Sequence, residues 1–136
     1  MQPMISNLNK RAGVKDRRGD PMTILLVDTD PEGLQGTAAL LQKVVPNSFV
    51  IAMLDPLMAA KYAFTTQVDA LLAKLDMKRM NGLQLCEFVK QKNPGARICL
   101  IGSPQEFCDC PELMDSSVQQ LTLPVSVDAL QHLFAA

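Results

Sequence analysis

The chain has 136 residues, of which 48% are hydrophobic, and its formal net charge is -1. This length and apolar content suit one domain with a single core. The near-neutral charge supplies no electrostatic reason to bind nucleic acid, so we expect no nucleic-acid partner. No segment reaches the roughly 20 apolar residues of a membrane-spanning helix, and the N-terminus lacks the apolar run of a signal peptide. We therefore expect a cytoplasmic protein with no membrane partner.

Residues 1–21 differ from the rest of the chain. They carry five Lys or Arg residues against two Asp residues, contain few large apolar side chains and show no helical or strand period. We predict a flexible basic N-terminal tail over 1–21 and one folded domain over 22–136. The tail is open to two interpretations: a solvated extension ahead of a start at Met22, or a contact for acidic partners.

From residue 22 onward, strand-like and helix-like patterns alternate. Short runs of β-branched and other apolar residues predict strands over 23–27, 49–53, 69–75, 98–101 and 118–123. Apolar residues at helical spacing predict helices over 31–45, 56–64, 83–93, 111–116 and 126–134. Strands separated by helices predict an α/β fold with a parallel sheet, right-handed crossovers and helices on both faces.

In a sheet of this kind, ligands bind at the carboxyl ends of the strands. No glycine-rich phosphate loop or internal repeat is present to suggest another site. The residues of interest at the predicted strand ends are Asp28, Thr29, Lys74, Gly102 and Leu123.

Residues 68–82 resemble the third strand and following loop of a response-regulator receiver domain, and the resemblance extends over about residues 22–134. Scaffold residues that match are Met77, Met80, Asn81, Gly82 and Pro124. The resemblance implies a flavodoxin-like (βα)5 three-layer sandwich, whose five-stranded parallel sheet has the order 2-1-3-4-5. It also implies a role in two-component (phosphorelay) signal transduction, and a cis peptide bond before Pro124.

The resemblance breaks down at the residues that carry the reaction of the family. Receiver domains have an acidic pair after the first strand, a phosphorylated Asp after the third, a Thr or Ser after the fourth and a Lys-Pro pair after the fifth. An aromatic switch residue lies three positions before that Lys, where this chain has Gln120. At the other positions, this chain keeps the first acid as Asp28 but has Thr29 at the second. It has Lys74 at the position of the phosphorylated Asp, Gly102 at that of the Thr or Ser, and Leu123 at that of the Lys.

Each replacement has a chemical consequence. A protonated lysine has no lone pair with which to attack a phosphoryl group, so Lys74 cannot replace the Asp nucleophile. The Mg²⁺ ion of the family needs anionic oxygen ligands, and two of three carboxylates are replaced here. We therefore predict a degenerate pseudo-receiver that is not an enzyme, has no catalytic residue, metal or cofactor, and acts through protein-protein contacts.

Asp28 is open to more than one interpretation. Its carboxylate can compensate the charge of Lys74, which we favour, or it can cap nearby backbone amides or retain metal binding. We expect the Lys74 nitrogen to lie within direct or one-water reach of Asp28, because an ammonium group in this crevice is costly unless it is paired.

Receivers resemble one another in forming dimers or meeting partners through the face made by the last two helices and the last strand. Here this face corresponds to residues 111–134, and we expect a partner from a signalling pathway, or a homodimer, to bind there. Ordinary core packing, however, explains most of its apolar residues. The candidate contact residues are Gln120, Leu121, Val125, Leu130 and Leu133.

Two alternative functions remain open from the residues alone. Asp76 lies two residues beyond Lys74 and offers another phosphate acceptor, although a solvated loop acid explains it more simply. Cys108 and Cys110 offer thiol-based redox or phosphocarrier chemistry, since closely spaced thiols can bind a metal or change redox state. Cys86 and Cys99 lie within apolar segments and are expected to be buried structural thiols.

Overall fold

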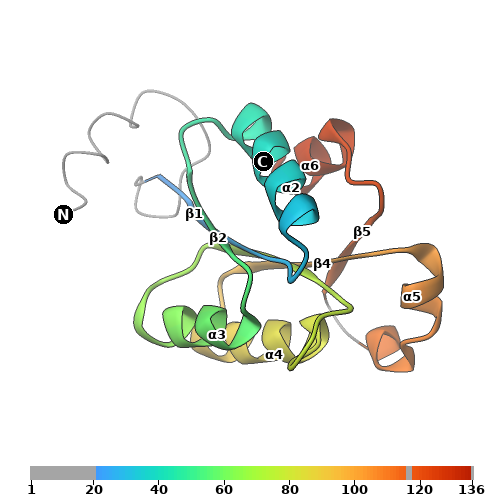
Figure 1. Cartoon of the computed structure of the whole chain (residues 1–136). Helices are drawn as coiled ribbons and strands as arrows, with labels where there is room; N and C mark the ends of the chain where they lie inside the picture. Colours follow the sequence, from blue (N-terminus) through green and yellow to red (C-terminus); the bar gives the residue numbers. More distant parts are fainter. Residues whose placement is uncertain (1–20, 116–117, 136) are drawn as a thin grey trace.

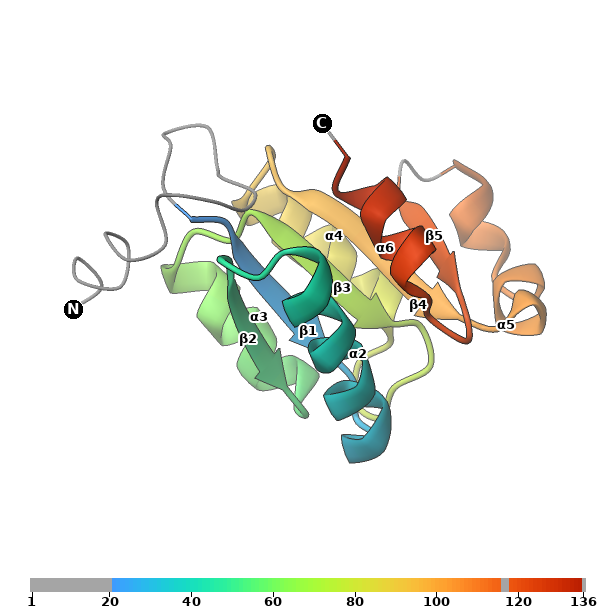
Figure 2. The same cartoon turned by 90° about the horizontal axis from the view of Figure 1, so that it is seen from above.

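The computed structural model describes residues 21–115 and 118–135, which form one twisted parallel sheet with helices on both faces (Figures 1 and 2). The five strands have the order β2-β1-β3-β4-β5, so the predicted flavodoxin-like fold is confirmed. The strands are β1 (Thr23–Val27), β2 (Phe49–Met53), β3 (Ala70–Lys74), β4 (Arg97–Gly102) and β5 (Gln119–Thr122). The helices are α2 (Pro31–Val44), α3 (Pro56–Thr65), α4 (Gly82–Lys92), α5 (Pro104–Cys108), the 3-10 helix η1 (Pro111–Asp115) and α6 (Val127–Leu133).

The core has two layers, one on each face of the sheet. Side chains of β1 alternate between them: Leu25 and Val27 pack with α3, α4 and η1, whereas Ile24 and Leu26 pack with α2 and α6. Figure 2 shows α2 and α6 on one face and α4 on the other. Because β1 and β3 are covered on both faces, their sequences are apolar without alternation, as expected for central parallel strands.

The first two helices begin where the sequence predicts. The Asp30 side chain accepts a hydrogen bond from the backbone N–H of Gly33 (3.2 Å), and Asp55 accepts one from Leu57 (2.9 Å). Each Asp precedes a Pro in the first turn, whose missing N–H costs nothing there. The Leu123–Pro124 peptide bond is cis, as predicted.

The segment after β4 differs from the prediction. The helix expected over 111–116 is the 3-10 helix η1, and the α-helix α5 precedes it. The Ser103 hydroxyl accepts a hydrogen bond from the Glu106 N–H (3.1 Å), and the Glu106 carboxylate accepts one from the Ser103 N–H (2.7 Å). This reciprocal capping box stabilises a helix of five residues that is too short to show an apolar period.

None of the helices in the described part of the chain is long and apolar enough to cross a membrane. Residues 1–20 of the predicted tail lie outside the described residues, so the division into a tail over 1–21 and a domain over 22–136 stays a prediction.

Candidate functional site

The strand register brings the ends of β1, β3, β4 and β5 to the same edge of the sheet. The last paired residues of neighbouring strands are Val27 with Ala73, Lys74 with Ile101, and Gly102 with Thr122. The predicted site residues therefore come together from four strand ends, and Lys74 occupies the last position of the central strand β3.

Asp28 is held from two sides. Its side chain is only 7% exposed, and its Oδ1 accepts a hydrogen bond from the Asp30 N–H (2.9 Å). A Cβ atom on Gly33 would lie 2.6 Å from Asp28 Oδ2, so the first turn of α2 closes over the carboxylate. Burial raises the pKa of Asp28, while the hydrogen bond from Asp30 and the positive charge of Lys74 oppose that rise.

Lys74 is half-buried and forms no direct ion pair with Asp28, and the predicted reach through one water stays a prediction. Among the described residues, no carboxylate oxygen lies within 4.0 Å of its nitrogen. The charge of Lys74 nevertheless favours the ionised form of Asp28, so the two groups interact over a longer distance. The interpretation of Asp28 as a backbone cap accounts for the direct contact that it does make.

Two backbone hydrogen bonds hold the loop after β3 against the strand ends. Leu75 N–H donates to the carbonyl oxygen of Ile101, and Gly82 N–H donates to the carbonyl oxygen of Leu75, both at 2.8 Å. Gly82 packs so closely on β3 that a Cβ atom there would collide with the Lys74 carbonyl group. Asp76, the alternative acceptor, lies within this loop with its side chain exposed.

The end of β4 is covered by α5, which the sequence did not predict. A Cβ atom on Gly102 would lie 3.1 Å from Glu106 Oε1 and 3.3 Å from Phe107 Cζ, so a carboxylate and an aromatic ring lie against this position. The Ser103 hydroxyl, one residue later, accepts the capping hydrogen bond of α5. The motif Ser-Pro-Gln-Glu at 103–106 is the signal that could have located these neighbours.

Two residues of the predicted contact face belong to the core. Leu121 is 5% exposed and Leu130 is fully buried, because β5 and α6 press both against the layer that contains α2. Val125 and Leu133 are half-buried, and Gln120 is exposed. Leu123, at the strand end, is 37% exposed. The accessible part of this face is therefore smaller and more polar than the sequence suggests.

The four thiols fall into two groups. Cys86 and Cys99 are buried as expected, and desolvation raises both pKa values, that of Cys99 to about 12. Cys108 is exposed, and the half-buried Cys110 lies 3.5 Å from a carboxylate oxygen of Glu112. Desolvation and Glu112 raise the pKa of Cys110, which is opposite to the shift that activates a thiol. No group of three or more His, Cys, Asp or Glu residues within 21–115 and 118–135 could hold a metal ion.

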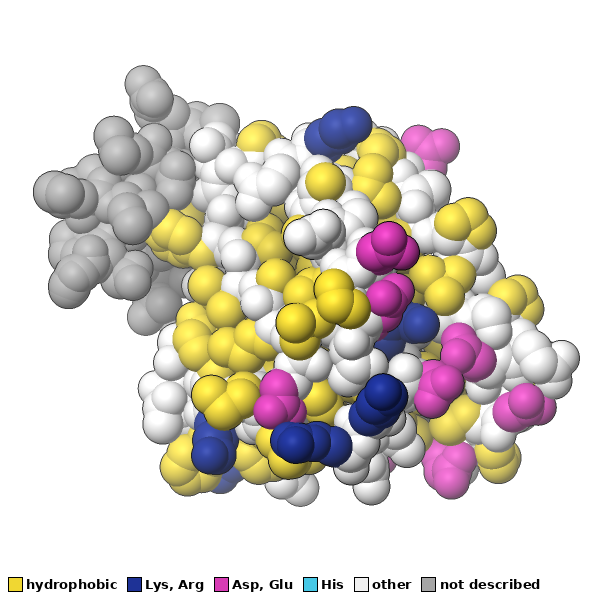
Figure 3. Space-filling view, in the orientation of Figure 1, with side chains coloured by type: hydrophobic (Ala, Val, Ile, Leu, Met, Phe, Trp, Pro, Cys, Tyr) yellow, Lys and Arg dark blue, Asp and Glu magenta, His cyan; other side chains and the backbone are white. Residues whose placement is uncertain are grey.

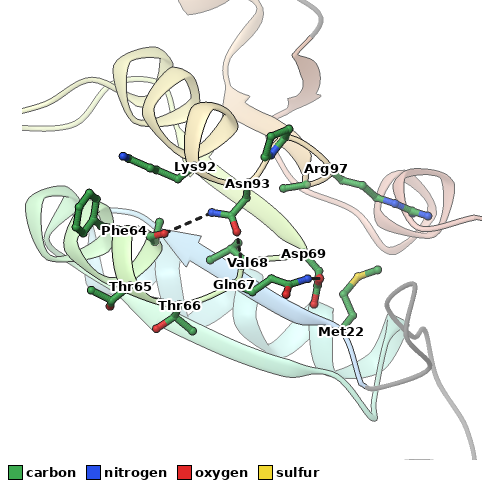
Figure 4. A pocket seen from close by; sticks show the side chains of 14 residues that line it. Met22, Phe64, Thr65, Thr66, Gln67, Val68, Asp69, Lys92, Asn93 and Arg97 are labelled. Atoms are coloured by element: carbon green, nitrogen blue, oxygen red, sulfur yellow. Dashed lines mark hydrogen bonds between the residues drawn. The ribbon is translucent and has the colours of Figure 1, made fainter.

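A cavity of about 680 Å³ lies at the other end of the strands, between the ends of α3 and α4 (Figure 4). The Asn93 side chain spans part of it, accepting from the Val68 N–H (3.0 Å) and donating to the Ala63 carbonyl (3.4 Å). The Lys92 nitrogen lies 4.5 Å from the centre of the Phe64 ring. These contacts connect the elements around the cavity. None of the predicted site residues lines it.

Known proteins resemble this chain in fold, whereas comparisons of sequence found no match. No family model and no curated protein matches the sequence. The structure resembles a response regulator receiver domain protein from Clostridium thermocellum, with a TM-score of 0.72, 16% identity and coverage of 83% of this chain and 90% of that one. It also resembles the receiver domain of a sensor histidine kinase from Pseudomonas aeruginosa PAO1, crystallised with magnesium in its cleft (TM-score 0.69, 20% identity, 84% and 94% coverage).

A third similar structure is described as an adenylate cyclase from Rhodopirellula baltica, with a TM-score of 0.66, 15% identity and coverage of 84% of this chain and 90% of that one. Fold similarity at this level of identity therefore does not determine whether a protein is an enzyme, and that question has to be judged from the residues at the strand ends. The strand order and these similarities together identify the fold of this chain as that of the response-regulator receiver domains.

Proposed function

We propose that residues 22–136 form a cytoplasmic, receiver-like domain of two-component (phosphorelay) signalling that lacks the phosphoacceptor Asp and acts through protein-protein contacts. It is not an enzyme, has no nucleic-acid partner, and follows a basic tail over 1–21. The single observation that supports this proposal best is Lys74 at the last position of β3, on the same sheet edge as the buried Asp28.

The nucleophile is the first missing part. Phosphoryl transfer to a receiver needs a carboxylate oxygen with a free lone pair, whereas a protonated amine has none. Asp76 is two residues further along, on the exposed loop rather than at the strand end. Within the described part of the chain it belongs to no group of three or more His, Cys, Asp or Glu residues that could hold a divalent cation.

The metal and phosphate contacts are the second missing part. Mg²⁺ prefers several oxygen ligands in near-octahedral geometry, and one Asp28 oxygen already accepts the Asp30 N–H. The cationic side chain of Lys74 further opposes a divalent cation beside Asp28. On the phosphate side, Gly102 has no hydroxyl group and Leu123 has no amine, so neither side chain can stabilise transferring oxygens.

Incubation with a small phosphodonor and Mg²⁺, followed by intact-mass measurement, tests the lost reaction. We expect no mass increase for this chain, whereas a receiver with an intact acidic pocket gains one phosphoryl group in parallel. The Lys74→Asp variant should also remain unmodified, because Thr29, Gly102 and Leu123 are still in place. A phosphoryl group on the unmodified chain that disappears in Asp76→Asn would overturn the proposal in favour of an Asp76 acceptor.

Protein contact is tested by affinity capture from the source cell. We expect a captured partner whose yield is the same with and without phosphodonor, and lower for Gln120→Lys and Val125→Glu on the accessible part of the predicted face. Glu87→Lys, an exposed charge change on α4, is the matched control and should not alter capture. Capture that requires the phosphodonor would contradict a phosphate-independent domain.

A further inference from the structure

The two margins of the sheet have opposite character. β5, at one margin, has four residues, and its outermost side chains Gln119, Gln120 and Thr122 are polar and exposed. β2, at the other margin, consists of Phe-Val-Ile-Ala-Met, and residues 44–54 around it contain no charged side chain. Exposed edge strands usually carry Lys, Pro or a bulge that discourages pairing with another strand, and β2 has none of these.

The backbone of β2 has a side that is directed away from the sheet. Phe49 N–H donates to Met22, and the Met53 carbonyl accepts from Asp28 N–H, so residues 49, 51 and 53 pair with β1. In a parallel ladder the alternate residues, Val50 and Ala52, therefore direct their N–H and C=O groups outward. Within the described ranges these outward groups have no hydrogen-bond partner.

Exposed apolar side chains gather beside this margin. Four of the five large hydrophobic side chains that the described residues expose belong to the segment after β2: Leu54, Leu57, Met58 and Phe64. Figure 3 shows the corresponding concentration of hydrophobic surface over β2 and α3. Leu54, at 47% exposed, directly follows the strand, and Met58 is 52% exposed. Patches of this kind on a small domain mark interaction surfaces.

The outer flank of α3 continues the same surface. Ala60 and Phe64 line an apolar groove with Phe88 of α4, so they lie on the inner flank. Met58 and Tyr62 are four residues apart on the opposite flank, which faces beyond the margin of β2. A strand added to β2 would thus lie next to an apolar helix flank as well as an open backbone ladder.

We propose that β2 is the interface of a homodimer, in which the β2 strands of two copies pair antiparallel about a two-fold axis at Ile51. The two sheets then form one continuous ten-stranded sheet. In this register Val50 of each copy exchanges both backbone hydrogen bonds with Ala52 of the other. Phe49 lies opposite Met53, and Ile51 opposite Ile51, on the face that carries α3.

A second copy of this chain is the occupant because the strand is complementary to itself. A two-fold axis places every residue of 49–53 against an apolar residue of the same segment. Like charges on two identical surface strands usually repel one another and oppose self-association. Residues 44–54 carry no charge, so two copies of this segment can approach without that repulsion. The Phe49–Met53 pair adds a favourable sulfur-aromatic contact.

Sedimentation velocity of the full chain over a concentration series tests the dimer. We expect the mass to rise from 14.9 kDa to twice that value with increasing concentration. Ala52→Lys places a charge on the exposed side chain of the β2 ladder and should leave only monomer. Gln120→Lys is the matched control on the outward side of β5 and should dimerise like the unmodified chain.

A second pair of variants separates loss of pairing from loss of folding. Ala52→Pro removes an outward N–H that makes no hydrogen bond to any described residue, so it should abolish the dimer while the far-ultraviolet circular dichroism is retained. Gln120→Pro is its control. In hydrogen exchange, the Val50 and Ala52 amides should become slower as concentration rises, and the Gln120 and Thr122 amides should not.

Three results would overturn the inference: a monomer throughout the concentration series, a dimer that dissociates in Gln120→Lys but survives in Ala52→Lys, and a dimer without concentration-dependent protection of Val50 and Ala52. None of these results bears on phosphorylation, so the dimer and the proposed function fail independently.

Discussion

The interior of the sheet and its carboxyl edge differ sharply in chemistry, although they are one residue apart along the strands. Leu26, Val27 and Ala73 have no exposed surface, and each packs among apolar side chains. The next positions hold a buried carboxylate at Asp28 and a half-buried ammonium at Lys74, which has no direct carboxylate partner among the described residues. This contrast teaches that the apolar interior stabilises the fold. Residues at the carboxyl ends of the strands can therefore differ in chemistry without loss of the fold.

The largest expected effect tests the interior. Leu72→Ala should lower the free energy of unfolding by about 2 to 5 kcal/mol, because it leaves a cavity in the fully buried layer between β3 and α2. Urea unfolding monitored by circular dichroism gives the value. Leu72→Met, which conserves volume, should cost less than about 1.5 kcal/mol. A small loss in Leu72→Ala would mean that the interior does not provide the stability assigned to it.

The second effect tests how tightly the edge is joined to the interior. Gly82→Ala should destabilise the domain by about 1 to 3 kcal/mol, because the new methyl group collides with the backbone carbonyl of Lys74. Gly36→Ala is a matched control on α2, where a Cβ atom meets nothing within 4 Å. That variant should instead stabilise the helix by up to about 1 kcal/mol. Equal effects of the two substitutions in thermal unfolding would contradict the close approach.

The third effect tests the edge itself. Lys74→Met should change the free energy of unfolding by about 1 kcal/mol or less, because Lys74 is half-buried and makes no direct ion pair among the described residues. A loss of several kcal/mol would reveal a buried, directly paired lysine, as removal of one partner leaves the other charge uncompensated. Urea unfolding at low and moderate salt separates the two cases.

The smallest expected effect concerns how the ionisation of Asp28 makes the free energy of unfolding depend on pH. Burial raises its pKa in the folded chain, so between the unfolded and folded values the folded chain retains a proton that the unfolded chain releases. Its contribution to stability is therefore lost as the pH rises through this interval. Asp28→Asn keeps an acceptor for the Asp30 N–H and should slightly increase stability at neutral pH.

The gain from Asp28→Asn should shrink as the pH falls through this interval and disappear below the unfolded pKa, because Asp28 is then protonated in both the folded and the unfolded chain. Denaturant midpoints measured across a pH series check this, with the exposed Asp76→Asn as control. A gain that grows on acidification would show that the pKa of Asp28 is lowered rather than raised.

Local rules explain which parts of the fold follow directly from the residues. The Asp-Pro pairs at 30–31 and 55–56 begin helices through bonds within three residues, and the apolar runs of β1 and β3 require a sheet covered on both faces. The strand ends at Asp28 and Lys74 follow from these elements together with the order of the strands. The short helix α5 was missed because five residues show no periodicity, although its capping box is local.

By itself the sequence determined the alternation of strands and helices, the two-sided burial of the sheet and the presence of Lys74 at the end of β3, because propensity, capping and periodicity act over a few residues. Tertiary structure alone decided that Lys74 makes no direct pair with Asp28, that Leu121 and Leu130 are buried, and that Phe107 lies against Gly102. These outcomes depend on distances between side chains from different elements. Such distances are set by how the layers pack together, which no short stretch of sequence specifies.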